Sequence, residues 1–139
     1  MTASRRLFHN LRSPRAWRHL RVRGLTTTLR AGAWAVLALR TLRRQIPTEG
    51  LDVRVVPAPA LPATATSGIE VALCIRRATC LERSLIMQRW LMAHGSPHDV
   101  LVGVAGGTES IDAHAWIDRY DQDEEGGGYQ VLTRVAPPA

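Results

Sequence analysis

The sequence has no lysine, only two cysteines, and no apolar run long enough to cross a bilayer. Two cysteines cannot form the disulfide framework that stabilises small secreted domains. The longest apolar run near the N-terminus, residues 31–39, has about half of the ~20 residues that a spanning helix needs. The N-terminus also lacks the apolar segment and cleavage site of a signal peptide. We therefore expect a cytoplasmic protein without a transmembrane segment.

Acidic residues are absent from residues 1–44, which contain 11 of the 18 arginines. All 12 acids lie in the rest of the chain, and the net charge is +6. A basic segment of this kind can bind an acidic protein, an anionic membrane surface or nucleic acid. The sequence shows no helix-turn-helix pattern, zinc module or aromatic stacking platform, so we do not expect a nucleic-acid-binding protein.

The composition divides the chain into three parts. Residues 1–55 form a basic region with helical spacing of apolar residues, and we expect its best helix over residues 27–44, ended by Pro47. Residues 56–68 are a Pro- and Ala-rich linker, which cannot be a regular helix or a central strand. Residues 69–139 contain the other expected elements, and we place the functional site there.

The pattern of this third part predicts an α+β fold. Helical signals cover residues 69–76 and the stretch that begins at Cys80. Three short strands are expected over residues 100–105, 113–120 and 129–135. We expect the strands to pair antiparallel in succession, with the helix packed on the small sheet.

The helix at Cys80 has both a start signal and a stop signal. Thr79, followed three residues later by Glu82, gives the T-x-x-E pattern of a capping box. Thr79 is then the N-cap residue and Cys80 the first helical residue. Gly95 suits the residue just past the helix, and Pro97 prevents its continuation.

The predicted position of Cys80 suits a nucleophile. In general, a helix N-terminus lowers the pKa of a cysteine thiol, and its N–H groups can hold an oxyanion. Cys74 lies among apolar residues and is expected to be structural. The two cysteines resemble a zinc-ligand line with His94 and His98, but they are too far apart, and Gly95 breaks the helix that should carry both histidines. We therefore expect no metal site.

A cysteine nucleophile needs a base, and three histidines are candidates. His94 is about 20 Å away along the same helix, and His98 is nearly as remote. His114 lies on a separate predicted strand, so folding can bring it back to the helix start. On a strand, His114, Trp116 and Asp118 share one face, and Trp116 would shield the pair from water if this face packs on the helix.

A third group should orient the imidazole of the base. Asp118 lies on the strand face of His114 but too far along it. Asp121 and Asp123, in the loop that follows, can reach the imidazole more easily. The residues alone leave this choice open.

Two short motifs together resemble a known family. C-L-x-R-S-L begins at Cys80, and H-A-W begins at His114. In this order they resemble the stand-alone leader peptidase of lasso-peptide biosynthesis, which is a papain-related, transglutaminase-like cysteine hydrolase. The resemblance covers roughly residues 69–135. It implies a papain/transglutaminase-like core with Cys80 as nucleophile, His114 as general base and an acid in the following loop, for which Asp123 is the candidate.

The resemblance also implies a function. It implies a cysteine endopeptidase that removes the leader of a lasso-type precursor peptide through a thioester. The partners would be a small leader-binding protein and an ATP-dependent, asparagine-synthetase-like cyclase that acts later. No cofactor, metal or nucleotide is needed for the hydrolysis, and the sequence has no phosphate-loop pattern. The alternatives are a non-catalytic scaffold of the same complex and acyl transfer to an amine.

Overall fold

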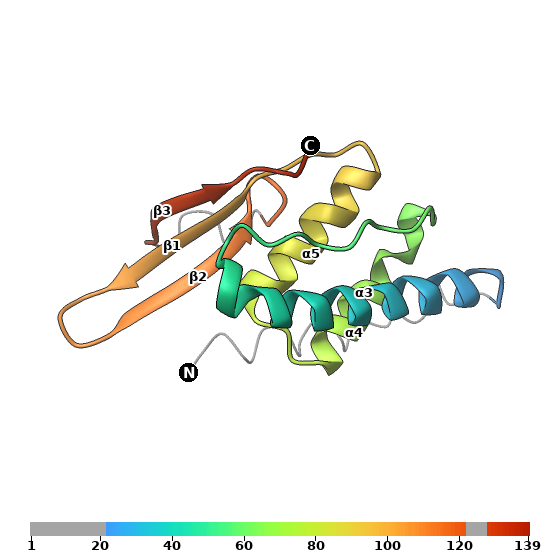
Figure 1. Cartoon of the computed structure of the whole chain (residues 1–139), viewed down its shortest axis with the longest axis horizontal. Coiled ribbons are helices and arrows are strands. Elements are labelled where there is room, and N and C mark those ends of the chain that lie inside the picture. The colour runs from blue at the N-terminus through green and yellow to red at the C-terminus, as the bar shows by residue number, and fades with distance from the viewer. Residues whose placement is uncertain (1–21, 122–127) are drawn as a thin grey trace. The chain divides into compact units, whose positions relative to one another are not determined.

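A computed structural model describes residues 22–121 and 128–139 of the chain (Figure 1). Its elements follow the order α3 (Val22–Glu49), the 3₁₀ turn η1 (Ala63–Ala65), α4 (Thr66–Ile75), α5 (Cys80–Ala93), β1 (Val100–Gly106), β2 (Ile111–Ile117) and β3 (Gln130–Val135). The fold is α+β, as predicted. Within the described residues, none of the helices is both long enough and apolar enough to cross a membrane.

The chain forms two compact units, and α3 contributes to both. The first unit combines the chain up to Val36 with Pro59–Arg77. The second combines Leu37–Ala58 with Ala78–Ala139. The second unit therefore contains α5, the whole sheet and the C-terminal part of α3.

In the first unit, α3 and α4 approach each other at two glycines. An added Cβ at Gly68 would lie 2.1 Å from the backbone oxygen of Thr28, and one at Gly32 would lie 3.1 Å from the backbone oxygen of Gly68. At Gly68 only a residue without a Cβ allows such a close approach of two backbones, whereas at Gly32 a Cβ would be tight. Ile69 and Leu73 on α4 are buried in this unit.

The helices of the N-terminal part are longer than predicted. Pro47 lies inside the last turn of α3 and does not end the helix before it. Proline removes one backbone N–H, but the next turn still closes, because Gly50 N–H donates to the Ile46 carbonyl at 3.0 Å. α4 begins at Thr66 instead of residue 69, because no proline follows position 62 in this segment.

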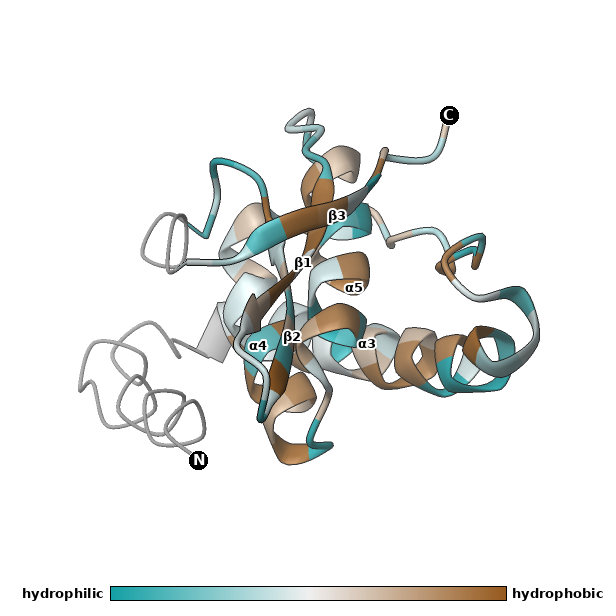
Figure 2. Cartoon of the chain, turned by 90° about the vertical axis from the view of Figure 1, so that its left-hand side faces the viewer, coloured by the Kyte–Doolittle hydropathy of each residue, from teal (hydrophilic) through white to brown (hydrophobic). Residues whose placement is uncertain are grey.

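The second unit contains an antiparallel sheet with the strand order β2-β1-β3. The predicted pairing in succession is wrong, because β1 is the central strand and pairs with both others. β1 is apolar along most of its length (Figure 2), which suits a central position. The short turn 107–110 keeps β2 beside β1, whereas the longer segment 118–129 lets β3 pair with the opposite edge. β2, which carries His114, is therefore an edge strand.

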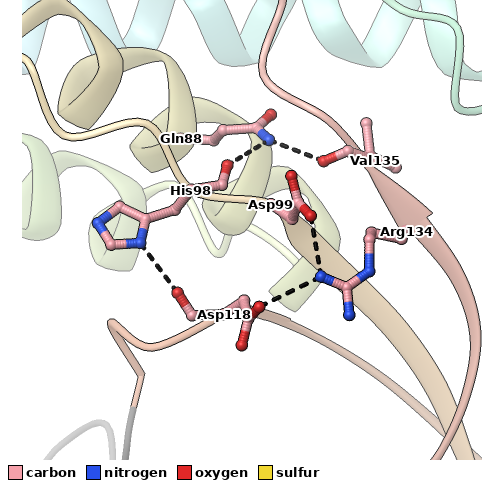
Figure 3. A network of polar contacts seen from close by, with 6 residues as sticks. All are labelled: Gln88, His98, Asp99, Asp118, Arg134 and Val135. Atoms are coloured by element: carbon pink, nitrogen blue, oxygen red, sulfur yellow. Dashed lines mark hydrogen bonds and ion pairs between the residues drawn. The ribbon is translucent and has the colours of Figure 1, made fainter.

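α5 packs on β2 and β1, and two polar side chains fix its position along the sheet. The Ser84 hydroxyl donates to the Ala115 carbonyl at 3.3 Å. One turn later, the Gln88 amide donates to the carbonyl oxygens of His98 and Val135 at 2.8 and 2.9 Å (Figure 3). The first turns of α5 thus lie beside the middle of β2, and the later turns lie near the end of β3.

The C-terminus of α5 closes as the sequence predicts. Gly95 has a positive φ of 75°, which is the left-handed conformation that glycine adopts most easily. Its N–H donates to the Met92 carbonyl at 3.0 Å, and the N–H of Ser96 donates to the Leu91 carbonyl at 3.0 Å. These two bonds form a Schellman motif and satisfy carbonyls that the helix leaves open.

Candidate active site

The start of α5 is held by the predicted capping box. The Thr79 hydroxyl accepts the N–H of Glu82 at 3.3 Å, and the Glu82 carboxylate accepts the N–H of Thr79 at 2.8 Å. Cys80 is therefore the first residue of the helix, and its half-buried thiol is not in a disulfide. The N–H groups of Glu82 and Arg83 both donate to Thr79. The N–H groups of Cys80 and Leu81 come earlier in the first turn, where the helix itself provides no carbonyl acceptor.

Glu82 is also paired with Arg43, which the sequence analysis did not predict. The guanidinium of Arg43 binds both carboxylate oxygens, at 2.9 and 3.2 Å. Burial raises the pKa of Glu82, but the hydrogen bonds from Arg43 and from Thr79 outweigh it, so the pKa lies below its ordinary value. The same bond raises the pKa of Arg43. The carboxylate beside the helix start is thus ionised and neutralised by a neighbouring arginine.

The structure brings together the elements that carry Cys80 and His114. Ser84, whose hydroxyl binds Ala115, is one helical turn after Cys80, which is about 6 Å along the axis. Ala115 directly follows His114 on β2. The first turn of α5 and the part of β2 around His114 are therefore neighbours, as the sequence analysis expected of the two elements.

His114 belongs to a cluster of three aromatic rings. Its ring is stacked on Trp116, with centroids 5.9 Å apart and planes 15° apart. The ring of Tyr129 lies 5.3 Å from that of His114 and 5.9 Å from that of Trp116. Gly103 on β1 makes room for this cluster, because an added Cβ would lie 2.9 Å from Trp116 Cη2. The shared face of His114 and Trp116 was predicted, whereas Tyr129 was not, because it comes from the far edge of the sheet.

The acids proposed to orient His114 differ in their surroundings. The Asp118 carboxylate accepts a bond from Arg134 at 3.3 Å (Figure 3). The Asp121 carboxylate accepts the backbone N–H of Ile117 at 2.9 Å and pairs with Arg83 at 3.3 Å. Ile117 is three residues from His114, which is about 10 Å along the strand. Both carboxylates therefore have arginine or backbone partners, and the orienting role proposed for either of them stays a prediction.

Asp123, the candidate chosen for the acid of the following loop, lies outside the described residues. Its role as the orienting group of His114 stays a prediction. Another described acid, Asp112, lies on the strand face of His114. Its carboxylate accepts a bond from the hydroxyl of Tyr129, a member of the aromatic cluster, at 2.6 Å. Asp112 was not among the predicted acids, because it precedes the histidine.

The other two candidate bases lie at the opposite end of α5 from Cys80. His94 caps the C-terminus of the helix, and its Nδ1 is 2.8 Å from the Trp90 carbonyl oxygen. His98 has both ring nitrogens engaged, Nδ1 with the Asp118 carbonyl and Nε2 with the Ser96 hydroxyl. A helix of 14 residues is about 21 Å long, so neither ring can reach the cysteine.

Comparison with known families gives a match over most of the chain. A family model described as the transglutaminase-like superfamily matches residues 34–134. The chain belongs to the transglutaminase-like superfamily. The match includes α5, β1, β2 and all but the last residue of β3, and therefore both Cys80 and His114. No curated protein and no solved structure matches the chain.

Membership in the transglutaminase-like superfamily indicates a fold of the cysteine-protease and acyltransferase type. The helix start that carries a cysteine and the neighbouring strand that carries a histidine have the chemical groups for such a reaction. The described residues contain no group of three or more His, Cys, Asp or Glu side chains that could hold a metal ion.

Proposed function

We propose that this transglutaminase-like protein is a cysteine endopeptidase that removes the leader from a lasso-type precursor peptide. The observation that carries the proposal is the placement of Cys80 at the capped start of α5, next to the strand segment of His114. Membership in the superfamily supports cysteine chemistry. The motifs C-L-x-R-S-L and H-A-W, at Cys80 and His114, support the narrower assignment to leader removal.

In this proposal His114 takes the proton of the Cys80 thiol, and the sulfur attacks the carbonyl carbon of the scissile peptide bond. The N–H groups of Cys80 and Leu81 stabilise the negative oxygen of the tetrahedral intermediate. The C–N bond then breaks, and His114 gives its proton to the leaving amine. Water, activated by His114, finally hydrolyses the thioester and regenerates the thiol. Asp123 is the proposed group that fixes the imidazole during these steps.

The precursor peptide is the proposed substrate, and two proteins are its proposed companions. A small leader-binding protein presents the leader, and an asparagine-synthetase-like cyclase uses the released core peptide. The site supports a presenting partner because the cysteine helix packs on a sheet that has three strands in the described part of the chain. Such a small surface offers few pockets for a long peptide.

The test is cleavage of the precursor by the full chain together with the leader-binding protein, followed by mass spectrometry. We expect Cys80→Ala to abolish cleavage, whereas Cys74→Ala, the matched control at the other cysteine, keeps most of it. Equal activity of the wild-type protein and Cys80→Ala would contradict the proposal and favour a scaffold role.

Acyl transfer is the second candidate function, because the superfamily fold also serves acyltransferases. The two reactions share the thioester on Cys80 and differ in what attacks it. Hydrolysis adds the mass of water to the released fragment, whereas transfer adds the mass of the amine. The same mass spectra, recorded with and without an added primary amine, distinguish them.

A further inference from the structure

The aromatic cluster of His114 has a polar tether that the proposed reaction does not use. The Tyr129 hydroxyl donates to Asp112 Oδ2 at 2.6 Å, which is typical of a charge-assisted bond between a hydroxyl and a carboxylate. Asp112 lies on β2, and Tyr129 immediately precedes β3. The tether therefore joins the two edge strands of the sheet across the central strand.

The register of the sheet explains how this contact forms. Asp112 is opposite Ala105, and Gln130 is opposite the preceding residue, Val104. Asp112 and Tyr129 are therefore at about the same level on the two sides of β1. Side chains alternate along a strand, so Asp112 is on the face of His114. The phenol ring lies over this face, where its contact with the histidine places it.

The imidazole of His114 consequently has two aromatic neighbours. Trp116 is buried and stacks on it, whereas Tyr129 is half-buried and meets it at a tilt of 38°. Trp116 is held by its place in the core. A half-buried tyrosine needs another restraint, because its ring can rotate toward solvent. The bond to Asp112 supplies this restraint.

We propose that Tyr129 is a positioning residue for His114 and that Asp112 holds it in place. The inference rests on the proposed function, in which His114 is the general base. The tethered ring limits the rotamers of the imidazole and keeps one nitrogen directed at the sulfur of Cys80. Tyr129 acts through His114 and does not touch the reacting atoms, so its loss lowers kcat and leaves KM nearly unchanged.

The experiment compares four variants of the full chain with the leader-binding protein and the precursor peptide. Tyr129→Phe and Asp112→Ala each remove the tether but keep the rest of the site. We expect each to lower kcat by about three- to tenfold, with the double variant no slower than either single variant. Asp112→Asn keeps an oxygen that accepts the phenol hydrogen, and we expect it to retain most of the wild-type kcat.

Asp99→Ala is the matched control, because this carboxylate also lies beside the sheet but pairs with Arg134. We expect it to keep the wild-type kcat. An unchanged kcat in Tyr129→Phe, additive losses in the double variant, or an Asp112→Asn variant as slow as Asp112→Ala would overturn the inference.

A second measurement does not depend on catalysis. The ring protons of His114 lie beside two aromatic rings, so their NMR shifts report where those rings are. We expect these shifts to move in Asp112→Ala and to stay in Asp112→Asn and Asp99→Ala. Unchanged shifts in Asp112→Ala would show that the bond between Tyr129 and Asp112 does not position the rings, and would overturn the inference. Failure of the proposed function would show differently, as a wild-type protein that cleaves no better than Cys80→Ala.

Discussion

Among single residues, Glu82 links the capping of α5 to the charge around Cys80. Its carboxylate closes the capping box with Thr79 and binds Arg43 through both oxygens. An unpaired carboxylate at this place would leave a negative charge two residues after Cys80. Its pairing with Arg43 neutralises this charge, so the same contact stabilises the helix start and suits the proposed chemistry.

The lowered pKa of Glu82 makes a prediction about stability. The ionised carboxylate stabilises the fold above its ordinary pKa of 4.5, and this stabilisation is lost as the pH falls through the lower folded value. We expect Glu82→Gln to reduce the free energy of unfolding by about 1–2 kcal/mol at neutral pH. We also expect the variant to lose less stability than the wild type between about pH 5 and about pH 3.

Urea unfolding of both proteins over this pH range measures the effect. Glu49→Gln is the control, because Glu49 is an exposed acid at the end of α3. This variant should follow the wild-type curve. If Glu82→Gln lost stability as steeply as the wild type over this pH range, protonation of Glu82 would not be the cause of the loss.

Among the elements, the sequence predicts best what depends on local chemistry. The start of α5 at Thr79 and its end at Gly95 were readable because caps need particular side chains at fixed spacing. The strand order could not be predicted from the sequence, because it depends on which of the strands becomes the central one. The tyrosine of the aromatic cluster was missed for the same reason, since Tyr129 and His114 meet only when β1 lies between their strands.

Gly103 on the central strand tests how strictly the cluster is packed. An added Cβ would lie 2.9 Å from Trp116 Cη2 and 2.9 Å from the backbone oxygen of Gln130. We expect Gly103→Ala to cost about 1–3 kcal/mol of stability, because the backbone or the indole must move. We also expect slower cleavage, since a displaced Trp116 no longer stacks on His114.

Thermal unfolding and the cleavage assay measure both effects of Gly103→Ala. Gly107→Ala is the matched control, because an added Cβ there has nothing within 4 Å. If Gly103→Ala and Gly107→Ala had the same thermal stability and the same cleavage rate, the packing of Trp116 over the central strand would affect neither stability nor cleavage.

For the whole molecule, the family match covers residues from both compact units, whereas the proposed chemistry lies in the second. The sequence predicted the α+β class and the two motifs of the site. The orienting acid stays a prediction: its choice depends on how the loop after β2 folds back, and Asp123 in this loop lies outside the described residues. The proposed partners also remain a prediction, since a partner surface cannot be read from this chain alone.

The proposed dependence on a leader-binding protein makes a prediction at the scale of the complex. A presenting protein raises the local concentration of the precursor at the site, so we expect it to increase kcat/KM by at least about tenfold. Cleavage rates measured with and without the leader-binding protein test this. The control is a short peptide that spans the cut site without the leader, whose rate should not respond. Equally efficient cutting of the full precursor by the chain alone would contradict the expected dependence.

The central claim is that Cys80 is a reactive nucleophile, because α5 begins there and the strand segment of His114, the proposed base, lies next to this helix start. The most direct test is the rate at which iodoacetamide modifies each cysteine at neutral pH, read by peptide mass spectrometry. We expect Cys80 to react at least about tenfold faster than Cys74, and His114→Ala to remove most of this difference. Equal rates at the two cysteines, or a rate at Cys80 that His114→Ala leaves unchanged, would contradict the account.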